Sequence, residues 1–304
     1  MNTLTKESRT DVQFHLAALR GDCERLKQLL DTGKVHIDSR DRDGTTPLIL
    51  SAAMGHTDCV KELLAQGADP TCCRTTGTSA LFFAAQGGFL EAARALLDAG
   101  APVDAPSVDG GTALFVSCQC GHLPVVEELI HRGADVNCAM KDGATPLFIS
   151  SQNGHSSVCS LLLSAGSRVD ARRSDGATPL WIACQCGHAP VVRLLLAAGA
   201  DVDALRQDGA SPLFKAAHKG HSSVVSELLR YRANRGLLPN GQSALHGAAM
   251  FGHVSCARLL LTGCDVTSAL RLRNAAGLTP PQAAAAHGRH DILKYFDSLT
   301  KTHS

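Results

Sequence analysis

Two identical pentapeptides, CQCGH at 118–122 and at 184–188, place cysteines and a histidine at a spacing that looks like zinc ligation. A structural zinc ion takes four ligands, and each copy supplies at most three. The copies are 66 residues apart, twice the repeat period described below, so on stacked helical layers they lie about 20 Å apart and cannot share an ion. We therefore expect no metal, and we interpret Cys118 and Cys184 as small core residues.

Other cysteines and histidines give no stronger sign of chemistry. Cys72 and Cys73 are adjacent, and we interpret them as exposed thiols. Two pairs of histidines stand three residues apart, but a helix stop separates the members of each pair: His218 with His221, and His287 with His290. Metal binding by these pairs is disfavoured.

The chain also lacks the usual arrangements of catalytic residues. The segments GHSS at 154–157 and 220–223 set a serine beside a histidine, and we interpret that serine as the N-cap of a helix. The sequence shows no nucleophile elbow, phosphate-binding glycine loop or His-Glu-x-x-His helix. We expect no catalytic residue, no cofactor and no enzymatic activity.

The elements that carry these residues recur at a fixed period. One leucine returns every 33 residues, at Leu48, Leu81, Leu114, Leu147, Leu180 and Leu213, and its column continues at Leu245 and Pro281. A glycine follows the same period, at Gly55, Gly88, Gly121, Gly154, Gly187, Gly220, Gly252 and Gly288. Self-similarity at one period predicts a repeat protein whose core grows unit by unit.

The clearest unit, 176–208, shows what each repeat builds. Thr178 followed by proline predicts a helix start, and Gly187 predicts its end in the left-handed conformation. A second helix with an apolar stripe follows and stops at Gly199. The remainder is short and polar. The unit is therefore a helix, a turn, an antiparallel helix and an extended finger.

A 33-residue period with T-P-L and G-H marks resembles the ankyrin repeat family. The T-P-L segments read TTPLI at 45–49, TSALF at 78–82, GTALF at 111–115, ATPLF at 144–148, ATPLW at 177–181, ASPLF at 210–214, QSALH at 242–246 and LTPPQ at 278–282. The resemblance implies an all-α solenoid of about nine stacked repeats, and implies that a histidine after T-P-L ties neighbouring repeats. That histidine survives as His246. Elsewhere Ile49, Phe82, Phe115, Phe148, Trp181 and Phe214 replace it, and we expect an aromatic ladder to pack instead.

The period sets the domain boundaries. We expect a disordered N-terminus over 1–10, an array over 11–299 and a tail over 300–304. The array divides into an N-terminal cap at 11–43, units at 44–76, 77–109, 110–142, 143–175, 176–208, 209–240 and 241–276, and a C-terminal cap at 277–299. From about Arg230 the units are irregular, since Arg232 replaces a closing glycine and the finger after 262 is long. That end is either loosened or shaped for a partner.

Composition bounds the surroundings of the protein. Twelve cysteines without a signal peptide or an 18-residue apolar stretch indicate free thiols in a reducing compartment, the cytoplasm, with the nucleus left open. Residues 1–204 hold 17 Lys/Arg and 23 Asp/Glu, and residues 205–304 hold 12 and 5, so the net charges are −6 and +7. This asymmetry reflects either solvent-exposed faces that differ in charge without a function, or a basic C-terminal end that binds an acidic partner. Basic residues do not cluster on one helix, which disfavours nucleic acid.

The surface therefore carries the function we predict. In the family architecture the residues before each turn glycine line a concave groove. They include Gln86, Gln119, Gln152 and Gln185, then His218 with Lys219, then Met250 with Phe251. We predict a monomeric, non-catalytic scaffold or adaptor that binds protein partners through this groove and the finger tips, and no small-molecule substrate. The alternative is a regulatory or substrate-receptor subunit of an enzyme complex. The resemblance also implies asparaginyl hydroxylation at Asn137, in the segment Asp135-Val136-Asn137 with Leu129 eight residues upstream.

Overall fold

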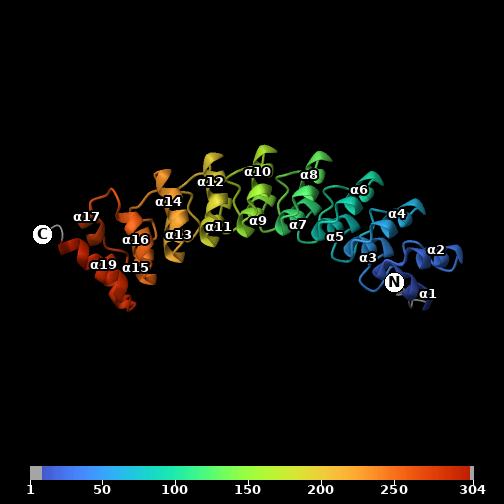
Figure 1. Ribbon diagram of the computed structural model, residues 1–304, viewed down its shortest axis with the longest axis horizontal. Helices are drawn as coiled ribbons and strands as arrows, with labels where there is room; N and C mark the ends of the chain where they lie inside the picture. The colour runs from blue at the N-terminus through green and yellow to red at the C-terminus, as the bar shows by residue number, and fades with distance from the viewer. Residues whose placement is uncertain (1–8, 302–304) are drawn as a thin grey trace. The chain divides into compact units, whose positions relative to one another are not determined.

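The computed structural model describes residues 9–301, and these residues are helical throughout except for turns and loops (Figure 1). Within that range no strand is formed, and one isolated bridge joins Cys73 to Ser79. The predicted all-α class is confirmed. By its contacts the chain divides into two compact units, Met1–Pro146 with Ser164–Ser167, and Leu147–Leu163 with Arg168–Ser304.

The first unit consists of four helix pairs, in which a short first helix is followed by a second helix after a turn. The pairs are α1 (Arg9–Arg20) with α2 (Cys23–Asp31), α3 (Pro47–Ala53) with α4 (Thr57–Ala65), α5 (Ala80–Gly87) with α6 (Leu90–Asp98), and α7 (Ala113–Cys120) with α8 (Leu123–His131).

The second unit continues the same pairing with one added helix. The pairs are α9 (Pro146–Asn153) with α10 (Ser156–Ser164), α11 (Pro179–Cys186) with α12 (Ala189–Ala197), α13 (Pro212–Lys219) with α14 (Ser222–Arg230), α15 (Ala244–Phe251) with α16 (Val254–Leu261), and α18 (Pro280–Ala286) with α19 (His290–Lys301). The added helix, α17 (Val266–Arg271), lies in the long finger after residue 262, where we expected the repeat to be irregular.

A hydroxyl side chain starts the first helix of most repeats. The side chain of Thr178 accepts a hydrogen bond from the Trp181 backbone N–H at 3.2 Å, and Thr46, Ser79, Thr112, Ser211, Ser243 and Thr279 make the equivalent bond. Each bond satisfies a donor that the first helical turn leaves unpaired. The predicted helix start at Thr178 is confirmed.

The turn glycine is required by a ring from the following repeat as well as by its backbone. Gly187 has φ +84°, and a Cβ added there would lie 2.7 Å from Nδ1 of His221. The same His221 donates from Nε2 to the carbonyl of Gln185 at 3.0 Å. His56, His122, His188 and His253 bond the preceding repeat in the same way, and Arg289 uses its Nε. The histidine of the G-H mark therefore ties neighbouring repeats together.

This contact also corrects one expectation. Ser222 is the first residue of α14, and the N-cap is His221, whose side chain makes no capping bond. The serine of GHSS at 220–223 therefore does not cap that helix. His221 fills the position because its ring is held by the carbonyl of Gln185 in the previous repeat.

Three residues at or near the column after the recurring leucine bond the next repeat through a ring nitrogen. In the second unit, Trp181 donates from Nε1 to the carbonyl of Ala210 at 3.0 Å, and His246 lies within 3.0 Å of the carbonyl of Leu278. His15 makes the matching contact with the carbonyl of Thr45 at 3.2 Å. Ala210, Leu278 and Thr45 all precede an N-cap. Trp181 thus replaces the missing histidine by a hydrogen bond rather than by stacking on another ring.

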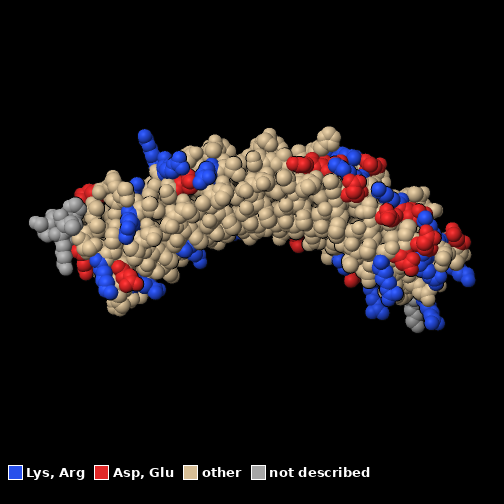
Figure 2. Space-filling model, in the orientation of Figure 1, with Lys and Arg blue, Asp and Glu red and all other residues tan. Residues whose placement is uncertain are grey.

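The second helices carry ion pairs between successive repeats. Arg94 of α6 pairs with Glu128 of α8 at 2.9 Å, and Arg193 of α12 pairs with Glu227 of α14 at 2.7 Å. Figure 2 shows charged side chains of both signs gathered over α2, α4 and α6, and few over α9 and α11. On this face the charged side chains therefore lie mostly away from α9 and α11.

The ends of the array differ from the predicted boundaries. Residues 9 and 10, expected in a disordered segment, form the first turn of α1, and residues 1–8 lie outside the described range. At the other end α19 runs through Lys301, past the expected end of the cap at 299, and residues 302–304 lie outside the description. The outer face of α1 is less polar than a terminal cap requires, since Val12, Leu16 and Leu19 are each about two-fifths exposed.

Candidate partner-binding surfaces

The predicted glutamine column lies at the end of the first helices, beside the turn glycines. In the first unit Gln86 and Gln119 are exposed, and in the second unit Gln152 and Gln185 are half-buried. The carbonyls of Gln86, Gln152 and Gln185 accept the inter-repeat histidine bonds. Among residues 9–301 the side-chain amides of these three glutamines make no hydrogen bond within the chain, so they can donate to and accept from a partner.

In the second unit the column ends in a cluster of rings and cations. The Phe251 ring is 41% exposed and lies 4.2 Å from the His218 ring, measured between centroids. His218 also contacts Phe214, 5.8 Å away, and Phe251 stacks parallel to His253 at 6.3 Å. Met250 is only half-buried, and its carbonyl accepts from Arg289. We call Phe251, His218, Lys215 and Lys219 the aromatic–basic cluster.

Burial and neighbouring lysines set the electrostatics of this cluster. Burial, followed by the charges of Lys215 and Lys219, lowers the pKa of His218 below its ordinary value. Burial and then Lys219 lower the pKa of Lys215, whose ammonium lies 5.4 Å from the centre of the Trp181 ring. Nδ1 of His218 is buried and has no hydrogen-bond partner in the described chain. An acidic group placed here would relieve the repulsion among these cations.

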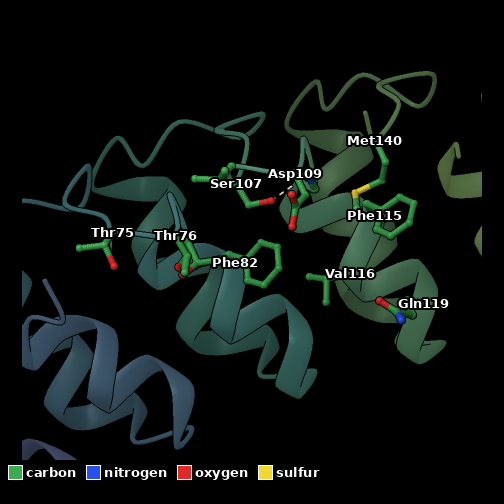
Figure 3. A pocket seen from close by; sticks show the side chains of 12 residues that line it. Thr75, Thr76, Phe82, Ser107, Asp109, Phe115, Val116, Gln119 and Met140 are labelled. Atoms are coloured by element: carbon green, nitrogen blue, oxygen red, sulfur yellow. Dashed lines mark hydrogen bonds between the residues drawn. The ribbon is translucent and has the colours of Figure 1, made fainter. Parts of the chain in front are cut away.

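A cavity in the first unit was not foreseen from the sequence. It has a volume of about 470 Å³ and lies between the fingers and the first helices α5 and α7. Phe82, Phe115, Val116 and Met140 form its apolar walls, and Asp109 lies at its edge, as Figure 3 shows. The remaining lining is neutral and polar, from Thr75, Thr76, Thr78, Ser107, Gly111 and Gln119, together with the exposed Val108. An apolar pocket with one carboxylate is suited to a single side chain of a partner.

The cysteines that looked like zinc ligands have separate structural roles. Cys118 and Cys184 are fully buried, Cys120 is exposed and Cys186 is half-buried. Burial raises the pKa of the Cys184 thiol well above its ordinary value, which keeps it protonated and unreactive. Among residues 9–301 no group of three or more His, Cys, Asp or Glu is arranged to hold a metal ion. The adjacent pair predicted to be exposed is split, since Cys72 is 8% exposed and Cys73 is exposed.

Asn137 is held in its finger by both backbone and side chain. Its N–H donates to Oδ1 of Asp135 at 2.9 Å, and its amide Nδ2 donates to the carbonyl of Gly166 at 3.3 Å. Leu129 is fully buried. The Asn137 amide is therefore held against the backbone of the neighbouring finger.

Comparison with known proteins agrees with this architecture. Ankyrin repeat domain-containing protein 29 of Homo sapiens is 55% identical over 53 residues, which are 17% of this chain and 18% of that protein. The protein of the same name from Danio rerio is 48% identical over 53 residues, again 18% of its length. The chain thus spans less than a fifth of these curated relatives. The crystal structure of the human ASB11 ankyrin repeat domain matches with a TM-score of 0.65 and 27% identity, over 71% of this chain and 96% of that one.

Two further findings complete the comparison. None of the helices in the described range is both long and apolar enough to cross a membrane. The family of ankyrin repeats (3 copies) matches residues 14–107, 58–140, 114–206 and 198–269, and so extends over most of the sequence. With its paired helices, turn glycines and fingers, the chain belongs to the ankyrin repeat family.

Proposed function

We propose that this protein is a non-catalytic scaffold or adaptor that binds an extended acidic segment of a partner protein at the aromatic–basic cluster. The observation that carries the proposal is the exposed Phe251 ring, packed on His218 and flanked by Lys219. Binding energy at protein interfaces concentrates in a few aromatic anchors ringed by polar contacts. One repeat before His218, the half-buried Gln185 has a side-chain amide that is free within the described chain and could supply a polar contact at the edge of the cluster.

The charge of the partner follows from the groups that surround the anchor. Asp208 is the carboxylate that acts on Lys215, and its own charge is engaged by Arg206 at 3.5 Å. The cations of the cluster therefore exceed its available carboxylates. A partner with an apolar side chain beside an acidic residue would place the first on Phe251 and the second near Lys219.

The test identifies partners and maps them at once. Proximity labelling in cells compares the parent protein with Phe251→Ala and Lys219→Glu, and binding of recovered partners is then measured with purified proteins. We expect Phe251→Ala to weaken binding by about 1–3 kcal/mol, and Lys219→Glu mainly to slow association and reduce its salt dependence. Tyr231→Ala is the matched control, since Tyr231 is 43% exposed but is not part of the cluster.

The outcomes separate the alternatives. If every partner binds both cluster variants as well as it binds the parent, the cluster is not the site. Recovery of one enzyme complex in fixed stoichiometry would instead support the alternative of a regulatory or substrate-receptor subunit. Helical circular dichroism and the melting curve must match the parent in each variant. We also propose a reducing compartment, the cytoplasm, on the basis of the twelve cysteines in the sequence, and a monomer.

A further inference from the structure

Finger arginines of the second unit lie between an aromatic ring and a carboxylate. The guanidinium of Arg173 lies 5.0 Å from the centre of the Phe148 ring and donates to Asp175, with Nη2 and Oδ2 2.6 Å apart. Arg206 lies 4.9 Å from the centre of the Trp181 ring, and its Nε is 3.1 Å from the same carboxylate. The hydrogen bond from Arg173 is the main reason that the pKa of Asp175 falls to about 2.

The cavity of the first unit occupies the same columns of the repeat without these arginines. Five residues, each 66 positions earlier, take the place of that arrangement: Phe82 for Phe148, Ser107 for Arg173, Asp109 for Asp175, Phe115 for Trp181 and Met140 for Arg206. All five line the cavity of about 470 Å³. The rings and the carboxylate are kept, and both guanidinium groups are gone.

The carboxylate of Asp109 is left without the partners that its counterpart has. Ala177 N–H donates to Asp175, whereas the equivalent Gly111 N–H donates to Oγ of Ser107 at 2.9 Å. Within the described chain neither Asp109 nor Asp142 of the same column forms an ion pair, while Asp43, Asp175 and Asp208 each bind an arginine. Asp142 accepts a hydrogen bond from the Ala144 N–H, and the equivalent N–H of Gly111 is the one that turns to Ser107 instead. Figure 3 shows the Asp109 side chain above the space between Phe82 and Phe115.

We propose that this cavity binds an arginine side chain of a partner protein, with its guanidinium over Phe82 and paired with Asp109. The small Ser107 leaves room where Arg173 lies in the second unit. A planar guanidinium can contact both groups at once, because it stacks on an aromatic ring and donates two parallel hydrogen bonds to a carboxylate. An apolar side chain would desolvate Asp109 without pairing it. The inference deepens the proposed function and names the chemistry of a second contact.

The probe is a single residue, so no partner has to be known. N-acetylarginine amide is titrated into the ¹⁵N-labelled full-length chain, and amide shifts are followed by NMR. We expect saturable shifts at Val108, Gly110 and Gly111, with a dissociation constant on the order of 1 mM for so small a ligand. N-acetylcitrulline amide has nearly the same shape without the charge and should bind about tenfold more weakly or not at all.

Two variants address the pocket in different ways. Asp109→Asn removes the charge and should weaken binding of the arginine probe about tenfold. Ser107→Arg supplies the chain's own arginine, as Arg173 does in its repeat, and should abolish the shifts without lowering the melting temperature. Asp208→Asn is the control, because Arg206 already lies beside that carboxylate, and it should leave probe binding unchanged.

Equal binding of arginine and citrulline, shifts that survive Asp109→Asn, or no saturable shift would overturn the proposal. If Ser107→Arg fails to fold, Asp109→Asn and the citrulline probe still decide. The result is independent of the aromatic–basic cluster. Loss of partner binding in Phe251→Ala without any arginine binding would retain the proposed function and reject this pocket, and the converse would do the opposite.

Discussion

Replacing Gly187 by alanine tests the contact that joins neighbouring repeats. Gly187 caps α11 in the left-handed region at φ +84°, and its N–H donates to the carbonyl of Ala183 at 2.9 Å. A methyl group there would meet the His221 ring at 2.7 Å, which real Cβ atoms do not tolerate. The imidazole would have to move, and its hydrogen bond to the Gln185 carbonyl would be lost.

Gly199 of the same repeat provides the matched control. Its φ is +88°, but a Cβ there would have no heavy atom within 4 Å. Gly199→Ala therefore carries only the backbone cost of the left-handed region, about 1 kcal/mol. Gly187→Ala carries the same cost, about 1 kcal/mol for the lost hydrogen bond and a similar amount for displaced ring packing. We expect destabilisation of about 2–3 kcal/mol for Gly187→Ala.

Urea unfolding followed by circular dichroism measures the difference between the two variants. In the His221→Ala background the ring is absent, and Gly187→Ala should then cost no more than Gly199→Ala. Equal destabilisation by the two alanines in the parent chain would show that the ring contact contributes nothing, and that backbone conformation alone selects glycine.

Three further predictions concern other parts of the second unit and one finger of the first. Arg232 is the non-glycine residue with positive φ, +60°, in the described chain; Arg232→Gly should raise stability by about 0.5–1.5 kcal/mol, and an unchanged urea midpoint would refute this. Burial lowers the pKa of His246 below 6.5, so the stability it contributes is complete above that value and declines as the pH falls through it, because the unfolded chain then binds the proton first. His246→Phe should flatten this part of the pH profile of the unfolding midpoint, while His218 and His253, whose pKa values burial also lowers, keep the remainder. Peptide mass spectrometry from hydroxylase-expressing cells should show a hydroxylated fraction at Asn137, and an unmodified peptide would count against it.

Much of the fold follows from the sequence because its determinants are local. Thr178 and Gly187 act within one helix, and their 33-residue recurrence is visible without any knowledge of packing. Contacts between repeats are less accessible. The expected link by the histidine after T-P-L is present at His246, which contacts the carbonyl of Leu278. The G-H histidine, with His221 as one example, adds a second link that was not expected. His15 was missed because the first repeat lacks T-P-L and its register is shifted by one residue.

The candidate sites were likewise predictable in part: a site on one helix could be read from the sequence, and a cavity formed by several repeats could not. Exposure of Phe251 was expected from its column, and its 41% exposure agrees. The cavity beside Asp109 was not expected, because a cavity is defined by what its neighbours fail to fill. A signal was nevertheless present: Arg74, Arg173 and Arg206 share one column of the repeat, and Ser107 and Met140 interrupt it. A search of each repeat column for positions where the usual residue is missing would have indicated the cavity.

Such interruptions are informative because a carboxylate or ring that loses its arginine becomes available to a group from outside the chain. A repeat stacks on its neighbours through shared positions, so each ring and carboxylate of a regular column has a partner within the array. Because Ser107 and Met140 stand where other repeats carry arginine, Asp109 is exposed and Phe82 is partly exposed, and nothing in the stacking of α5 on α7 requires this. Leaving both rings and the carboxylate in place keeps a surface complementary to guanidinium. Under the two proposals made for this chain, a partner is recognised at positions where the repeat departs from its own pattern, and the array is stabilised at positions where it does not.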